Sequence, residues 1–72
     1  MYTVISYKPL PYTLNGNRMF ELVLQNGTET MTVKSKANYD YAHLPRDMTD
    51  LKINANIKPN KSHYVITDIE IV

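Results

Sequence analysis

The sequence predicts an all-β fold in one small domain, and three observations support this prediction. The dominant hydrophobic period is two rather than 3.6, and β-branched and aromatic residues are frequent. An Asn-Gly pair separates two strand-like segments, which is typical of a β-hairpin. The chain has only 72 residues and no cysteine, so packing must stabilise it without disulfides. We therefore expect one domain spanning residues 1–72.

The first predicted strand runs from Tyr2 to Lys8 and has two partly apolar faces. Such a strand is expected to be partly buried on both sides, or to bend across a closed barrel. The next segment, Pro9 to Gly16, contains two prolines, which have no backbone N–H to donate. We therefore expect a stiff, extended loop there rather than a paired strand.

The segment from Arg18 to Lys36 is predicted to form a hairpin, with Asn26 and Gly27 as the two-residue loop of a type I′ turn. In that register Leu22 faces Met31 on an apolar side, and the other side carries mostly polar pairs. A slip by one residue would destroy this separation. Turn chemistry and side-chain sorting therefore agree on this hairpin.

Residues 37–50 break the alternation, and we expect one short helix or two irregular turns there, with Pro45 ending or restarting the helical segment. Strict alternation returns from Leu51 to Lys58, which predicts an amphipathic strand with one wet face. A turn over 58–62 leads into a last strand from His63 to Val72. In this strand we expect the following to point inward: Val65, Thr67, Ile69 and Ile71. We expect the following to point outward: Tyr64, Ile66, Asp68 and Glu70.

Five strands of this length can bury a useful core in so short a chain by curling into a barrel, whereas an open sheet would leave exposed edges. The expected order is β-β-β-α-β-β, with a small helical turn, in a five-stranded antiparallel barrel. This order resembles the oligonucleotide/oligosaccharide-binding (OB) barrel, in which a helix joins the third and fourth strands. An SH3-like barrel is the alternative, although its short helix is expected between the fourth and fifth strands. A third arrangement is an open sheet that dimerises through Ile69–Val72.

The sequence offers little for catalysis. Neither His43 nor His63 has a second histidine or a carboxylate at metal-ligand spacing. The two glycines belong to no phosphate-binding pattern. We therefore expect a non-enzymatic binding protein without catalytic residues, metal or cofactor.

Binding of single-stranded DNA or RNA is the favoured hypothesis, because such ligands need a basic groove with aromatic stacking platforms. Lysines and asparagines follow the wet face of the 51–58 strand, and six tyrosines supply aromatic rings. If the last hairpin pairs simply, Tyr64 emerges on that same face. The candidate nucleic-acid-binding residues are Lys34, Lys36, Lys52, Asn54, Lys58, Tyr64, Tyr39 and Tyr41. The opposing interpretation is a solvated sheet face, which the net charge of only +1 favours.

A protein-interaction or inhibitor module is the second hypothesis. The β-prone C-terminal segment has neither charge nor proline in its final pair, so its edge can accept another strand. Self-association or a protein partner would then use Ile69, Ile71 and Val72. The first residues lack the basic start and apolar core of a signal peptide, and no apolar run is long enough to span a bilayer. We therefore expect a cytoplasmic protein that does not bind membranes.

Overall fold

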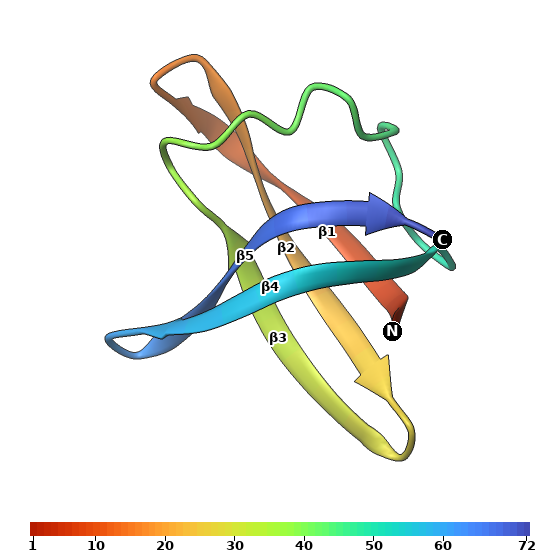
Figure 1. Ribbon diagram of the computed structural model, residues 1–72. Coiled ribbons are helices and arrows are strands. Elements are labelled where there is room, and N and C mark those ends of the chain that lie inside the picture. The colour runs from red at the N-terminus through yellow and green to blue at the C-terminus, as the bar shows by residue number, and fades with distance from the viewer.

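Five β-strands and no helix make up the computed structural model, which describes residues 1–72 (Figure 1). The strands are β1 (Tyr2–Leu14), β2 (Asn17–Asn26), β3 (Glu29–Ser35), β4 (Lys52–Asn60) and β5 (His63–Ile71). They form a closed barrel in the order β1-β2-β3-β5-β4. The all-β class and the closed five-stranded barrel are therefore confirmed. The barrel is not wholly antiparallel as expected, because β3 and β5 pair in parallel.

The segment predicted to be a stiff loop is instead the second half of β1, which continues through both prolines to Leu14. Pro9 pairs with Phe20 of β2, and a register irregularity before Thr13 accommodates Pro11. The loop prediction was wrong because β1 has a partner on one side only over this stretch. Its pairing with β4 is confined to its first two residues, so a missing N–H on the outer edge removes no hydrogen bond.

The β2–β3 hairpin has the predicted faces but not the predicted register. Asn26 pairs with Glu29, which leaves Gly27 and Thr28 as the two-residue loop. Gly27 has a φ of 65°, and glycine at the first loop position is typical of a type II′ turn rather than the expected type I′. Leu22 consequently faces Val33 instead of Met31. A shift by two residues keeps every side chain on its face, so hydrophobic alternation alone could not distinguish the two registers.

A bulge in β5 changes which of its residues point into the barrel. Asn54 pairs with Glu70 and Asn56 pairs with Thr67, so β5 has one extra residue between these pairs. The bulge contains Asp68, whose φ is 56°. Before it Ile66 points into the core, and after it Ile69 does. The prediction that Ile66 points outward was therefore wrong, because strict alternation cannot continue through a bulge.

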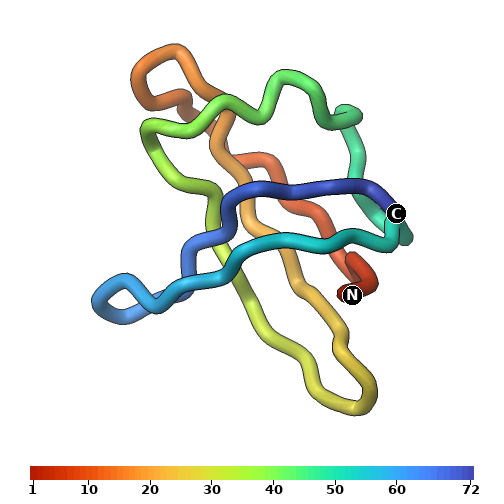
Figure 2. Tube along the Cα trace, in the orientation of Figure 1, coloured from red at the N-terminus to blue at the C-terminus, as the bar shows by residue number.

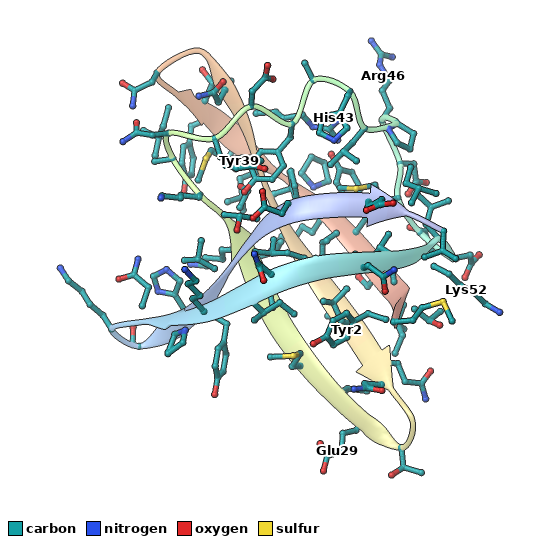
Figure 3. The ribbon with its side chains drawn as sticks, viewed as in Figure 1. Tyr2, Glu29, Tyr39, His43, Arg46 and Lys52 are labelled. Atoms are coloured by element: carbon teal, nitrogen blue, oxygen red, sulfur yellow. The ribbon has the colours of Figure 1, made fainter.

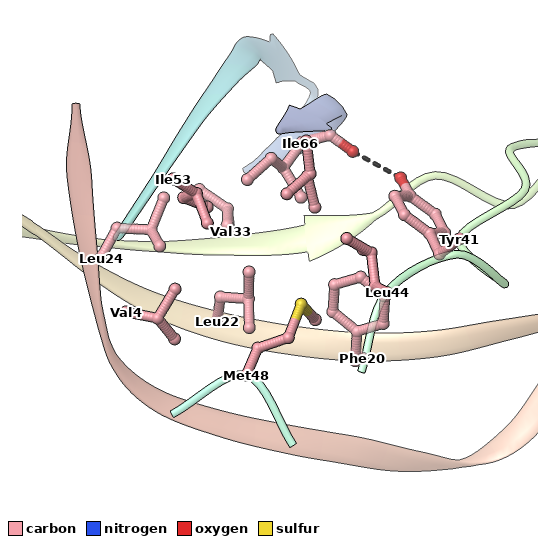
Figure 4. Packing of buried hydrophobic residues seen from close by; sticks show 11 residues of the cluster. Val4, Phe20, Leu22, Leu24, Val33, Tyr41, Leu44, Met48, Ile53 and Ile66 are labelled. Atoms are coloured by element: carbon pink, nitrogen blue, oxygen red, sulfur yellow. Dashed lines mark hydrogen bonds between the residues drawn. The ribbon is translucent and has the colours of Figure 1, made fainter. Parts of the chain in front are cut away.

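The connection from β3 to β4 closes one end of the barrel with turns instead of the expected helix. Tyr41, Leu44 and Met48 from this connection are buried in the core. Figure 4 shows them packed with side chains from the strands, and Tyr41 lies edge-on to Phe20 with ring centroids 4.9 Å apart. The alternative expectation, irregular turns, describes this segment.

Arg18 of β2 holds part of this connection in place. Its guanidinium donates hydrogen bonds to three successive carbonyl oxygens, those of residues 44–46, at 3.1–3.3 Å. The same group donates to the hydroxyl of Tyr7 at 2.7 Å and lies over the rings of Tyr7 and Phe20. These bonds satisfy backbone groups that a helix would otherwise pair internally.

Three hairpin turns project from the barrel, which Figure 2 shows clearly. They join β1 to β2, β2 to β3, and β4 to β5. The β1–β2 and β4–β5 turns lie at one side of β3, and the β2–β3 turn extends from the opposite end (Figures 1 and 2). The structure contains no helix long and apolar enough to cross a membrane.

Candidate nucleic-acid interface

A hollow of about 380 Å³ lies between the β1–β2 and β4–β5 hairpins, with the end of β3 as its floor. Tyr12 and Met19 line it from the first hairpin, and Asn60 and His63 line it from the second. The floor includes Lys34, Ser35 and Lys36. Two projecting hairpins therefore flank a floor that carries two lysines.

A second hollow of about 200 Å³ adjoins the first and continues over β4 and β5. The two hollows share Lys36, Asn60 and Val65, so they form one continuous depression. We call this depression the lysine groove. Its lining includes Tyr12, Lys34, Lys36, Lys58, Asn60, His63, Val65 and Thr67.

Strand pairing brings the three lysines of the groove together. Lys34 pairs with Val65 across the parallel β3–β5 seam, and Lys58 pairs with Val65 on the other side of β5. A half-buried valine therefore sits between two lysines in one row across three strands. Lys36 lies two residues beyond Lys34, on the same face of the strand. The parallel seam is the feature that gathers these side chains.

The lysine groove is electropositive, because no carboxylate lines either hollow. The acidic side chains nearest in the sheet lie outside the hollows. Glu21 is the cross-strand neighbour of Lys34 on β2. Asp68 follows Thr67 on β5, and its carboxylate accepts hydrogen bonds from Tyr39 at 2.7 Å and Asn56 at 2.9 Å. These bonds, together with those from Thr67 and the nearby charge of Lys58, lower the pKa of Asp68.

Three of the eight predicted binding residues, Lys34, Lys36 and Lys58, meet in the groove. Lys52 and Asn54 also point outward, as expected for β4. They lie at the opposite end of that strand, however, where Lys52 pairs with Thr3 of β1. Figure 3 shows Lys52 near the C-terminus, far along β4 from the hairpin turn. Neither residue lines the groove.

Tyr64 does not share a face with Lys58, contrary to the prediction. It pairs with Pro59 of β4, one position away from the pair of Lys58 and Val65. Its side chain therefore points to the other face, where it lines a separate hollow with Tyr2 and Met31. The prediction assumed a simple hairpin with Lys58 and Tyr64 on one face, whereas the actual pairs, Lys58 with Val65 and Pro59 with Tyr64, place them on opposite faces.

The rings of Tyr39 and Tyr41 pack within the protein and are therefore not free to stack on bases. Tyr41 is only 1% exposed, so no base can stack on it, and this part of the prediction was wrong. Tyr39 is half-buried, with its ring centroid 5.0 Å from that of Tyr41 and its hydroxyl bonded to Asp68. Sequence placed both residues in a loop, where rings are normally accessible, and gave no sign that this loop fills the barrel.

Sequence reasoning missed Tyr12, His63 and Asn60 as groove residues. Tyr12 is 48% exposed and lies within Pro9 to Gly16, the segment that the sequence predicts to be a stiff loop. The available signal was an aromatic residue in a proline-containing segment outside the predicted strands. Recognising it required knowing that the prolines lie within a strand whose hairpin overhangs β3.

No group of three or more His, Cys, Asp or Glu side chains is placed to hold a metal ion. The groove has the chemistry of an anion-binding surface, with ammonium groups, amides and an exposed phenol ring. No protein-family model, curated protein or solved structure matches this chain.

Proposed function

We propose that this protein binds single-stranded DNA or RNA in the lysine groove and that its barrel is of the OB type. The observation that carries the proposal is the position of the groove relative to the strand order. In OB barrels, oligonucleotides and oligosaccharides bind across the second and third strands, between the β1–β2 and β4–β5 loops. The lysine groove occupies the corresponding region, between those two hairpins and over β3. The SH3-like alternative is less well supported, because only a two-residue turn joins β4 to β5.

The side chains favour an anionic ligand over a neutral sugar. Lys34, Lys36 and Lys58 would contact successive phosphates along the groove, since no carboxylate lines either hollow and the neighbouring Glu21 and Asp68 lie outside them. Tyr12 would stack on a base, because its ring is half-exposed at the wall of the hollow. This division of labour, with phosphates on lysines and a base on an aromatic ring, is typical of proteins that bind single strands.

The test is fluorescence anisotropy with a labelled oligothymidylate across a series of salt concentrations. Three phosphate contacts predict a log–log slope of about −2, at about −0.7 per contact on a single strand. Lys36→Ala should reduce the slope by about 0.7, because this lysine lines both hollows. Lys52→Ala is the matched control, since Lys52 is an exposed lysine outside the groove. Absence of binding at low salt, or equal effects of the two variants, would contradict the proposal.

The stacking role of Tyr12 has its own test. Tyr12→Ala should weaken binding by about 1–3 kcal/mol, the usual cost of losing one aromatic platform. Tyr12→Phe keeps the ring and should bind nearly as well as the unmodified protein. If both variants lose affinity equally, the hydroxyl rather than the ring makes the contact.

A further inference from the structure

The barrel is closed by two short seams, so four stretches of strand have a partner on one side only. β1 pairs with β4 only through Tyr2 and Thr3, and Val4 exchanges backbone hydrogen bonds with Asp50 and Leu51 just before β4. The outer edge of β1 beyond Val4 and that of β4 beyond Ile53 are unpaired. β3 pairs with β5 only from Val33 onward, which leaves the start of β3 and the end of β5 unpaired. Unpaired edges present free N–H and C=O groups to other chains.

Three of these four edges are obstructed. The outer edge of β1 has an irregularity at Ile5 followed by Lys8, Pro9 and Pro11, and the outer edge of β4 ends in Lys58 and Pro59. Bulges, lysine and proline on an edge all oppose pairing with a new strand. The free edge of β5 begins at the bulge, where the N–H of Asp68 already donates to the hydroxyl of Tyr39 at 3.1 Å. The C-terminal edge predicted for self-association is therefore interrupted where it starts, and the side chain of Ile69 is buried.

The fourth edge, residues Glu29–Thr32 of β3, has no such protection. It contains no proline or lysine and no bulge interrupts its pairing with β2. Asn26 and Glu29 close the two-residue turn, so alternate residues along β3 direct their backbone groups toward β2. Thr30 and Thr32 lie between those positions and direct their N–H and C=O groups outward. The carbonyl of Thr32 faces Tyr64 where the β3–β5 seam begins, so the open groups are the N–H and C=O of Thr30 and the N–H of Thr32. These two threonines form an open strand edge.

A hollow of about 360 Å³ lies directly inside this edge. Glu29, Thr30 and Met31 line it from β3, Tyr64 lines it from the neighbouring strand β5, and Tyr2 lines it from β1. Tyr64 is 45% exposed, although it points toward the inner side of the sheet. A strand added along Glu29–Thr32 would therefore place its inward-facing side chains in this hollow and cover the exposed ring.

We propose that a second copy of this chain occupies the edge, through antiparallel pairing of two Glu29–Thr32 segments about a two-fold axis. Antiparallel pairing makes the edge complementary to itself, because each copy supplies the same outward donors and acceptors. The inward-facing residue Met31 of the second copy fits a hollow walled by two tyrosines, since thioethers pack favourably against aromatic rings. The net charge of +1 opposes association of two copies only weakly. This proposal is independent of nucleic-acid binding.

The experiment is sedimentation velocity of the full chain from micromolar to millimolar concentration, together with amide hydrogen exchange followed by NMR. We expect a monomer–dimer equilibrium in which the amides of Thr30 and Thr32 exchange slowly only when the dimer is populated. Thr30→Pro should weaken the dimer at least about tenfold, because one donor is lost on each side of the axis. Thr30→Val keeps the N–H and should leave the dimer intact.

The proposal is overturned by a monomer throughout this concentration range. It is also overturned by a dimer in which Thr30 and Thr32 remain unprotected, since another surface would then be the interface. Exchange in the unmodified protein decides the matter even if Thr30→Pro does not fold. Oligonucleotide binding by Thr30→Val and by the unmodified monomer reports separately on the lysine groove.

Discussion

Tyr41 links the two strands of the parallel seam at the point where they separate. Its hydroxyl accepts a hydrogen bond from the backbone N–H of Lys36 at 2.8 Å and donates one to the carbonyl of Ile66 (Figure 4). The carbonyl of Ile66 belongs to the last β3–β5 pair, Ser35 with Ile66, and the N–H of Lys36 follows directly after it. The phenol therefore takes the place of a missing backbone contact between the strands. Burial of this group is the main reason that the pKa of Tyr41 is raised.

Tyr41→Phe is expected to lower the free energy of unfolding by about 2 kcal/mol, because it leaves a partly buried N–H and a carbonyl without partners. Urea denaturation followed by circular dichroism measures this change. Tyr12→Phe is the matched control, since Tyr12 is half-exposed and no hydrogen bond to its hydroxyl is present. An equally small effect of both substitutions would show that the Tyr41 hydroxyl does not support the seam.

Asp68 gives the protein an acid-sensitive contact just beyond this seam, between β5, β4 and the β3–β4 connection. Hydrogen bonds from Tyr39, Asn56 and Thr67 stabilise its ionised form and lower its pKa below the ordinary 3.8. A lowered folded-state pKa adds stability that is fully present above the unfolded value and is lost as the pH falls through the folded value. Asp47 behaves in the same direction, because Thr49 donates to it.

We therefore expect the urea midpoint to fall as the pH drops below about 4. Asp68→Asn should flatten this acid limb, since asparagine tolerates the positive φ of 56° but does not titrate. The measurement is a series of urea titrations between neutral and strongly acidic pH. An acid limb of unchanged steepness in Asp68→Asn would contradict a contribution from this carboxylate.

At the scale of the element, substitutions in the β2–β3 turn can distinguish the predicted hairpin register, with Asn26 and Gly27 as the loop, from the observed one, with Gly27 and Thr28. Gly27 has a φ of 65°, and a Cβ added there would meet no atom within 4 Å. Gly27→Ala should therefore lose about 1–2 kcal/mol through backbone strain alone. Asn26 has no positive φ, so Asn26→Ala should change stability by less than about 0.5 kcal/mol. Thermal unfolding of both variants measures the difference, and equal losses would indicate the type I′ loop instead.

Alternation in the sequence predicted which faces of β2, β3 and β4 are buried. Successive side chains point to opposite faces of a strand, so the apolar residues identify the buried face. It did not predict the register of the β2–β3 hairpin, since a shift by two residues leaves every side chain on the same face. It failed for β5, where the extra residue at Asp68 exchanges the faces. It also failed for Pro9 and Pro11, because a strand with one free side tolerates residues that a central strand excludes.

At the scale of the whole molecule, chain length and strand number were sufficient to predict a closed barrel. The material that fills its end was not predictable from periodicity, because Tyr41, Leu44 and Met48 lie in turns with no regular spacing. The candidate site was predicted only in part, because alternation along a strand does not show which strands and turns come together. Alternation predicts that Lys34, Lys36 and Lys58 point outward. Tyr12 and His63 line the same groove only because of the three-dimensional arrangement of two hairpins.

The two seams also determine how the chain reaches this structure. The β2–β3 and β4–β5 hairpins join neighbouring segments, but the seams pair Tyr2 with Ile53 and Val33 with Tyr64, which are far apart in the sequence. Folds dominated by such distant pairings fold slowly, on a scale of about milliseconds to seconds. In stopped-flow refolding, Gly27→Ala should mainly slow folding, whereas Tyr41→Phe should mainly accelerate unfolding. We therefore expect the hairpins to form first and the barrel to close last, so that the strand edges of the hairpins stay unpaired until closure.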